Sequence, residues 1–349
     1  RWNHDYDLAG KRVAVIGTGA SAIQFVPQIA PQVAHLDLFQ RTPPWIMPKP
    51  DRPIYAAERW LFKHVPLTQR LVRAALYWAL EGRVVGFALH PRLMTMVQKI
   101  ALRHLRKQVA RPSLRKTLTP DYTIGCKRVL ISNDYYPALS RSNVEVVTDS
   151  VLRIEADGVI TADGIKHPAD CLIFGTGFQA SDPLPRGCII GRDGIDLMDA
   201  WRDGAHAYKG TTVPGYPNLF LIVGPNTGLG HNSMILMIEA QVAYILDALK
   251  HMQRQRLTTV EVKPAVEHAY NQQLQDKLKR TIWNTGGCQS WYLDPRTGKN
   301  TTLWPGSTWR FKQVTRHFAL KDYSVSQAPA LALPRAVATP HSTTEGSLS

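Results

Sequence analysis

The chain has 349 residues, of which 44% are hydrophobic and 20% are charged, and this composition excludes a wholly disordered protein. Its formal net charge of +15 favours anionic partners such as cofactor phosphates, nucleic acid or a membrane surface. No apolar run reaches the roughly 20 residues that span a bilayer. No DNA- or RNA-binding motif is visible, so we predict no nucleic-acid partner.

The first elements in chain order form a βαβ pattern. Residues 11–17 are predicted to form a strand, residues 20–30 a helix and residues 35–40 a second strand. This order is typical of the first half of a Rossmann-like, dinucleotide-binding unit.

A GxGxxA motif joins the first strand to the helix. Gly17 permits a tight turn, Gly19 lets a pyrophosphate approach the backbone, and Ala22 lets helix and strand pack closely. The free N–H groups of the helix N-terminus attract the phosphate charge. A purely structural glycine turn is the alternative, but the strand–turn–helix context favours dinucleotide binding.

The end of the second strand indicates which dinucleotide is bound. NAD-specific sites tend to carry an acid here, whereas this chain has Gln40, Arg41 and Thr42. Arg41 can pair with a 2′-phosphate, and Thr42 can add a hydroxyl. This favours NADPH over NADH, and the alternative is that Arg41 is only a solvated residue at a strand end.

Residues 56–109 are both basic and apolar at helical spacing. They hold ten Lys or Arg residues against only Glu58 and Glu81, a net charge of +8, and Pro66 and Pro91 interrupt them. A basic amphipathic helix can lie on a membrane surface, so weak membrane contact is one interpretation. A helical insert whose basic side chains face water is the interpretation that we favour.

The later part of the chain alternates short strands and longer helices. Two Asp-Gly turns within residues 151–178 predict a β-meander that ends in the buried strand CLIFGTGF. The other predicted elements are strands at 127–132, at VEVVT and at 218–224, and helices at YYPAL, 233–251 and 264–282. Residues 325–349 are rich in Ala, Pro, Ser and Thr and are predicted to be a disordered tail.

Four cysteines, Cys126, Cys171, Cys188 and Cys288, are widely spaced and form no CxxC pair. This spacing predicts neither a zinc site nor a disulfide framework, and it fits a reducing compartment. We therefore expect a cytoplasmic protein.

Two later strands also end in glycine-rich turns, GTGF and GPNTGLGHN. The second turn ends near His231 at the N-terminus of a helix. The free backbone N–H groups of that helix N-terminus could face a ring carbonyl or a phosphate. Both could equally be ordinary strand ends of a doubly wound sheet, and the residues alone leave this open.

Five segments in one order carry a family resemblance, namely GKRVAVIGTGASAIQ, FQRTPPWIMP, TIGCKRVLISNDYYPAL, CLIFGTGF and YPNLFLIVGPNTGLGHNSM. They resemble the class B flavoprotein monooxygenases of the Baeyer–Villiger type, over about residues 1–320. The resemblance implies an α/β, two-dinucleotide-binding-domain (Rossmann-like) flavoprotein fold with a helical insert, and with the first FAD-binding half missing. Trp2 falls where the family fingerprint FxGxxxHxxxW ends, although Asn3 departs from the usual Pro or Asp.

The same resemblance implies a division of the chain. Residues 1–150 would form an NADPH-binding Rossmann domain with the basic helical insert at about 55–110. Residues 151–324 would supply the meander of that domain and the C-terminal part of the FAD-binding domain, and 325–349 the tail.

The chemistry of the family is a second implication. NADPH reduces FAD, the reduced flavin reacts with O₂ to give a C4a-peroxyflavin, and this inserts one oxygen next to the carbonyl of a small hydrophobic ketone, giving an ester or lactone. The alternatives are oxygenation of a nitrogen or sulfur substrate, and an inactive NADPH-binding fragment. The oligomeric state stays unknown.

Site residues are carried over from the matching motifs. Arg128 matches the active-site arginine, whose permanent charge would stabilise an anionic adduct. Lys127 matches a second contact to the 2′-phosphate, and Trp291 a tryptophan near the nicotinamide ribose, although a plain buried aromatic is nearly as good an interpretation. His231 is assigned no catalytic role. The predicted cofactor-binding residues are Gly17, Thr18, Gly19, Ala20, Ser21, Ala22, Gln24, Arg41, Thr42, Lys127, Thr176, Gly177, Phe178, Pro225, Asn226 and Trp291.

Overall fold

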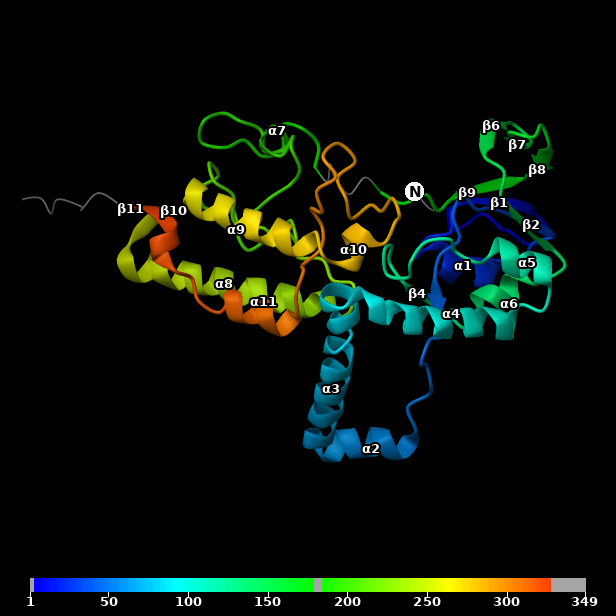
Figure 1. The fold of residues 1–349 in the computed structure, drawn as a ribbon, viewed down its shortest axis with the longest axis horizontal. Helices are drawn as coiled ribbons and strands as arrows, with labels where there is room; N and C mark the ends of the chain where they lie inside the picture. The colour runs from blue at the N-terminus through cyan, green and yellow to red at the C-terminus, as the bar shows by residue number, and fades with distance from the viewer. Residues whose placement is uncertain (1–2, 179–183, 328–349) are drawn as a thin grey trace, which may run out of the picture.

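A four-stranded parallel sheet forms the first half of the protein in the computed structural model, which describes residues 3–178 and 184–327 (Figure 1). Its strand order is β5-β2-β1-β9. The strands are β1 (Arg12–Ile16), β2 (His35–Phe39), β5 (Val144–Val147) and β9 (Cys171–Phe174). Helix α1 (Ala22–Ile29) connects β1 to β2, so the predicted βαβ unit is confirmed.

Alternating side chains cover the two faces of this sheet differently. Val13 and Val15 of β1 pack with the buried residues of α1 and of α6 (Tyr135–Leu139). Ala14 faces the other way, toward a meander of three antiparallel strands. The meander strands are β6 (Val151–Glu155), β7 (Gly158–Thr161) and β8 (Lys166–Pro168), as predicted. A parallel sheet covered on both faces is the expected result of such continuous apolar strands.

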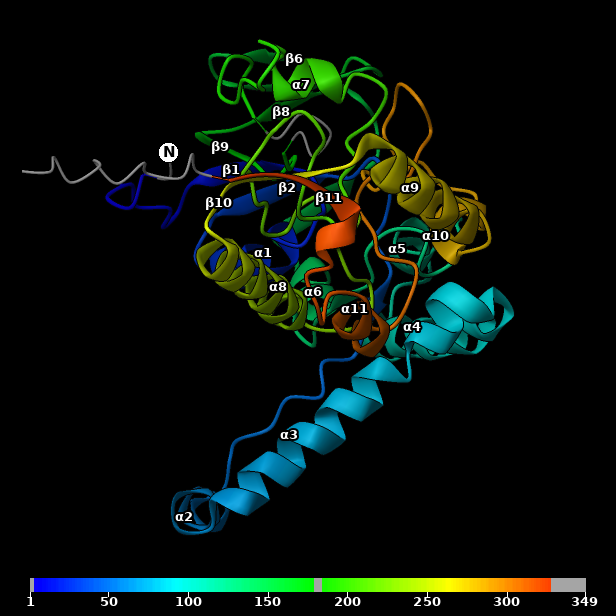
Figure 2. The same ribbon diagram turned by 90° about the vertical axis from the view of Figure 1, so that its left-hand side faces the viewer.

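The basic insert is helical and leaves the body of the protein as an arm. Helices α2 (Ala56–His64) and α3 (Pro66–Glu81) form this arm, which projects away from the rest in both Figure 1 and Figure 2. The chain returns through η1 (Val85–Leu89), η2 (Pro91–Leu93), α4 (Met94–Gln108) and α5 (Pro112–Thr117). Across residues 3–178 and 184–327, no helix combines the length and apolarity needed to cross a bilayer.

Helices supply most of the regular secondary structure in the second half of the described chain. Its long helix α8 (Met234–Gln255) packs against β10 (Leu257–Val262), which pairs with β11 (Tyr323–Gln327) in antiparallel fashion. Two short strands, β3 (Ile46–Met47) and β4 (Leu130–Ile131), pair in parallel fashion. The remaining elements are α7 (Leu197–Ala200), α9 (Pro264–Leu278), α10 (Ile282–Thr285), α11 (Thr308–Val314) and η3 (Leu320–Asp322).

Three sequence-based expectations need correction. Residues 218–224 do not form a strand. A strand needs a neighbouring strand for its backbone hydrogen bonds, and none of the described residues pairs with this segment in a sheet. The strand expected at 127–132 shrinks to β4. Residues 325–327 belong to β11 rather than to a disordered tail, while 328–349, like Trp2, lie outside the described residues.

Candidate functional site

Gly17 lies where three strand ends meet. Its N–H donates to the carbonyl of Phe39 at the end of β2 (3.1 Å), and the carbonyl of Ile16 accepts from the N–H of Gly175 after β9 (2.8 Å). Gly17 has a φ of +113°, and a Cβ there would lie 2.5 Å from the carbonyl oxygen of Gly175. Only glycine fits this crossing point, which leaves the turn from Gly17 to Ser21 free to approach a ligand.

Hydrogen bonds fix the turn that leads into α1. The side chain of Ser21, its N-cap residue, makes no capping hydrogen bond. The Thr18 hydroxyl donates to the carbonyl of Thr42 (3.1 Å), and the amide of Gln24 donates to the carbonyl of Ala20 (2.7 Å). The N–H groups of Ile23, Gln24 and Phe25 already donate to the carbonyls of Gly19 and Ser21, so the backbone donors that could meet an anion lie in the preceding turn, which Thr18 ties to residue 42.

A cationic pocket lies beside this turn. It is a cavity of about 340 Å³, and its lining residues are Arg41, Thr42, Asp121, Tyr122, Lys127, Gly287, Cys288 and Gln289. Three predicted site residues thus lie in one pocket although they come from two distant segments.

The electrostatics of the cationic pocket favour an anion. Burial lowers the pKa of Lys127, and the nearby positive charge of Arg41 lowers it further, while Asp121 opposes the change. The Lys127 ammonium also lies over the ring of Tyr122, 5.0 Å from its centroid. Two like charges that disfavour each other would both gain from a phosphate between them.

A disulfide borders the cationic pocket. Cys126 is bonded to Cys288, with a Cα–Cα distance of 6.2 Å, whereas Cys171 and Cys188 are free. The expectation that the cysteines form no disulfide is therefore wrong. The two residues are 162 positions apart, so their spacing carries no sign of a contact that only the tertiary fold creates.

Arg128 lies near the segment that holds Trp291. The side chain of Arg128 is exposed, and its positive charge acts on the hydroxyl of buried Tyr292, whose pKa burial raises. Trp291 is 52% exposed and packs against Tyr292, with ring centroids 4.6 Å apart. The structure thus brings these two predicted site residues to the same neighbourhood.

The two later glycine turns differ in burial. Thr176, Gly177 and Phe178 extend from β9 into solvent, and Phe178 is fully exposed. Pro225 and Asn226 are buried, and the amide of Asn226 donates to the carbonyls of Asn300 and Leu303. Within the described chain the Oδ1 of Asn226 is buried without a hydrogen-bond partner.

Glu81, at the end of α3, is a buried residue that sequence reasoning missed. Its carboxylate accepts hydrogen bonds from Asn232 Nδ2 (2.8 Å), Thr308 Oγ1 (2.7 Å) and the backbone N–H of Trp309 (2.9 Å). Burial alone would raise the pKa of Glu81, but these hydrogen bonds lower it overall. In the sequence, only its place as the single acidic residue of α3 pointed to Glu81. Its hydrogen bonds connect the arm to the turn before α8.

His231 is buried next to this carboxylate. Its Nε2 lies 3.7 Å from Glu81 Oε2, and neither ring nitrogen has a hydrogen-bond partner among residues 3–178 and 184–327. Burial lowers the pKa of His231, the charge of Glu81 opposes this, and Arg83 lowers the pKa further. His231 is therefore a buried imidazole whose charged form is disfavoured by burial.

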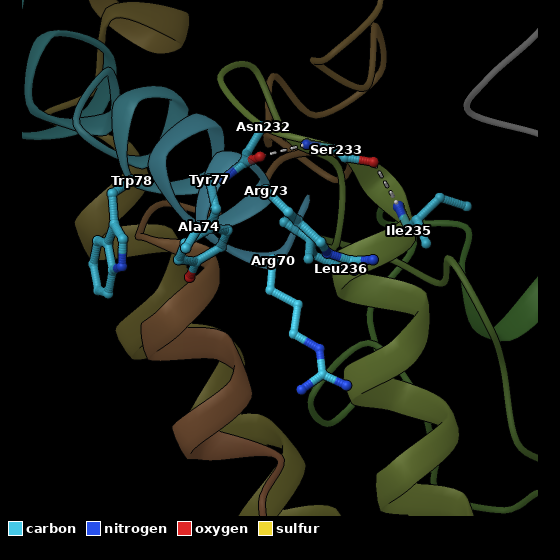
Figure 3. Close-up of a pocket in the computed structure, with 9 residues that line it drawn as sticks. All are labelled: Arg70, Arg73, Ala74, Tyr77, Trp78, Asn232, Ser233, Ile235 and Leu236. Carbon is cyan, nitrogen blue, oxygen red and sulfur yellow. Dashed lines mark hydrogen bonds between the residues drawn. The ribbon is translucent and has the colours of Figure 1, made fainter. Parts of the chain in front are cut away.

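A larger groove lies between α3 and the first turn of α8 (Figure 3). Its volume is about 620 Å³, and it is lined by Arg70, Arg73, Ala74, Tyr77, Trp78, Asn232, Ser233, Ile235 and Leu236. Figure 3 shows Ser233 at the start of α8, where its hydroxyl accepts from the N–H of Ile235. Apolar surface and two arginines thus meet beside the turn that ends at residue 233.

Comparison with known proteins gives consistent results, although no family model matches the chain. It is 58% identical over 333 residues to a Baeyer–Villiger monooxygenase of Pseudomonas aeruginosa, covering 95% of this chain but 63% of that protein. It is 33% identical to an uncharacterised monooxygenase of Mycobacterium bovis, and the match covers 98% of this chain and 68% of that protein. The structure of an oxidised steroid monooxygenase bound to NADP matches with a TM-score of 0.80 and 25% identity, over 94% of this chain and 69% of that one. The chain thus spans less than two thirds of the length of the Pseudomonas relative.

Proposed function

Because this chain belongs to the family of the Baeyer–Villiger monooxygenases, we propose that its parallel-sheet part binds NADPH. One observation carries the proposal, namely that Arg41, Thr42 and Lys127 converge in a cationic pocket beside the glycine turn. An adenosine 2′-phosphate is the group that distinguishes NADPH from NADH, and it fits two cations and a hydroxyl.

The glycine turn would hold the pyrophosphate of the same cofactor. Gly17 and Gly19 let the phosphates approach the backbone, and the turn that leads into α1 supplies N–H donors. In our proposal the segment from Thr18 to Ala22 forms the cradle, and Gln24 lies one turn further along its helix. Trp291 would pack beside the nicotinamide ribose.

FAD is the second proposed cofactor, and when bound it supplies the reaction with O₂. Asn226 fits such a role because its buried Oδ1 has no hydrogen-bond partner in the described ranges, so a ring N–H of the flavin could donate to it. The exposed apolar side chain of Phe178 is of the kind that a bound cofactor covers. Pro225, Thr176 and Gly177 would complete this part of the site.

Arg128 is the proposed catalytic residue. Attack on a ketone places negative charge on the carbonyl oxygen, and a fixed guanidinium stabilises that charge without reorganisation. Arginine suits this task because it stays protonated at any working pH. The protein would then insert one oxygen atom next to the carbonyl of a small hydrophobic ketone, giving an ester or lactone.

The groove between α3 and α8 is the proposed entry for that substrate. Its apolar side chains include Tyr77, Trp78, Ile235 and Leu236, and it adjoins the turn assigned to the flavin. A nitrogen or sulfur substrate is the alternative, and dependence on Arg128 distinguishes the two, because heteroatom oxygenation forms no carbonyl adduct.

The first test compares NADPH with NADH on the purified chain by calorimetric titration. Arg41→Ala should weaken NADPH binding about 10- to 100-fold, the equivalent of a lost charge-assisted pair, and should leave NADH nearly unchanged. Arg59→Ala, an exposed arginine of α2, is the matched control. Equal losses for the two nucleotides would refute the 2′-phosphate assignment.

The second test uses the protein loaded with FAD. Arg128→Ala should leave NADPH-driven flavin reduction running and abolish ester formation from ketones. Normal ester yield from the variant would refute the catalytic assignment, and a yield of sulfoxide or N-oxide alone would favour the heteroatom reaction.

The arm supports a separate proposal of weak contact with a membrane surface. Trp60, Leu67, Leu71 and Trp78 are each about 60% exposed, and basic residues lie between them. Such a surface binds anionic lipid through apolar burial and charge together. Co-sedimentation with phosphatidylserine vesicles that is lost at high salt would support this, and equal sedimentation with neutral vesicles would contradict it.

A further inference from the structure

A cluster of imidazole and carboxylate side chains lies far along the sheet from the glycine turn. His35 and Asp37 of β2 have the same parity as Phe39, which packs into the core between the sheet and the meander. Their side chains therefore share that face of the sheet. Asp37 is also the register partner of Glu145 on the neighbouring strand β5.

The functional atoms of this cluster converge. His35 Nε2 lies 3.1 Å from Asp37 Oδ1, and one ligand atom from each of His35, Asp37 and Glu145 lies within 4.8 Å of the others. A further imidazole approaches from the meander: His167 Nδ1 on β8 lies 3.7 Å from the same Asp37 oxygen, although His167 does not belong to the three-residue group.

The burial of the Asp37 carboxylate carries a desolvation cost. Its side chain is only 5% exposed, and the two groups that approach its Oδ1 are imidazoles, which carry charge only when protonated. A buried carboxylate is costly unless cations or hydrogen-bond donors compensate it. A metal ion would place a positive charge beside this carboxylate, in addition to its hydrogen bond with His35.

We propose that His35, Asp37 and Glu145 hold a divalent transition metal, with Zn²⁺ as the best fit, and that the ring of His167 turns in as the fourth ligand. Zinc takes four ligands at about 2.0–2.2 Å in tetrahedral geometry, which places neighbouring ligand atoms about 3.3 Å apart. The two distances to Asp37 Oδ1 bracket this value. Two imidazoles select zinc-like metals over magnesium or calcium, which prefer oxygen ligands.

The site would fasten the meander to the parallel sheet. His167 comes from β8, while His35 and Asp37 come from β2 and Glu145 from β5. The ring of His167 also packs edge-on against Phe39, with centroids 5.2 Å apart, and the carbonyl of Phe39 accepts the hydrogen bond from Gly17. A bound metal would therefore stiffen the strand end that supports the glycine turn, and this inference does not depend on the cofactor proposal.

The experiment is a metal titration of the purified chain without a histidine tag. The protein is stripped with EDTA and titrated with ZnCl₂ by calorimetry, and with CoCl₂ by visible absorption, since tetrahedral Co²⁺ gives strong ligand-field bands. The test variants are His35→Gln and His167→Gln. His35 is 40% exposed, so its variant should fold normally.

Two controls isolate the cluster. His206→Gln removes an imidazole from another His–carboxylate pair, in which His206 Nδ1 lies 2.6 Å from Glu267. Cys188→Ser removes an exposed thiol that could bind zinc adventitiously. Neither change should affect binding at the cluster.

We expect one Zn²⁺ per chain, a rise in Tm on adding ZnCl₂, and an affinity loss of more than tenfold in either test variant. The rise in Tm should disappear in both variants and persist in both controls. Zinc binding that is unchanged in the two test variants, or no binding at micromolar ZnCl₂, would overturn the proposal and leave a hydrogen-bonded His35–Asp37 pair.

Discussion

Loss of the Cys126–Cys288 disulfide should have the largest effect on stability of any single change considered. The bond closes a loop across 162 positions of the chain. In the chain-entropy model, a cross-link of this length removes about 17 cal/mol/K from the unfolded state, or about 5 kcal/mol at 25 °C. Cys288→Ser should therefore lower the free energy of unfolding by up to about 5 kcal/mol, beyond the range of most substitutions.

Urea unfolding with and without dithiothreitol measures this effect. Reductant should lower the midpoint of the wild-type chain to that of Cys288→Ser and leave the variant itself unchanged. Cys188→Ser is the matched control, because Cys188 is free and exposed. It should unfold like the wild type under both conditions.

Two results together would refute the reasoning. One is a wild-type midpoint that does not respond to reductant. The other is a thiol titration of the unfolded, unreduced chain that finds four thiols instead of the two expected for one disulfide. If reductant lowers the urea midpoint but leaves nucleotide affinity unchanged, the disulfide is present but does not shape the cationic pocket.

Three further changes test individual contacts. Gly17→Ala should destabilise the protein in thermal unfolding by more than the ~1–3 kcal/mol of backbone strain, because the new Cβ would also collide with Gly175. Gly164→Ala is the control, because Gly164 also has a positive φ but lies in open space, so it should show the backbone strain alone. Glu81→Gln should cost about 2–3 kcal/mol in urea unfolding, since its hydrogen bonds lose their charge, and no loss would contradict the buried network. The lowered pKa of His231 means that the unfolded state binds the proton more tightly, so stability should fall as pH drops below about 6.5. His231→Gln should remove that part of the pH profile; the lowered pKa of Glu81 acts only at more acidic pH, below about 4.5.

The sequence by itself determined the local parts of the dinucleotide-binding unit. The strand β1, the glycine turn, α1 and β2 follow one another within residues 12–39, so their periodicity and turn chemistry are readable without tertiary information. Arg41 follows directly from its place after β2. The meander was predictable for the same reason, because its Asp-Gly turns set the register of adjacent strands.

Only the tertiary structure decided what those parts meet. The cationic pocket takes Gly287, Cys288 and Gln289 from a segment far along the chain, and the disulfide joins the same distant segments. The run at 218–224 looked like a strand because apolar content is local, whereas pairing depends on a partner. Glu81 and the Asp37 cluster became visible only as buried charges, since burial is a property of packing rather than of residue order.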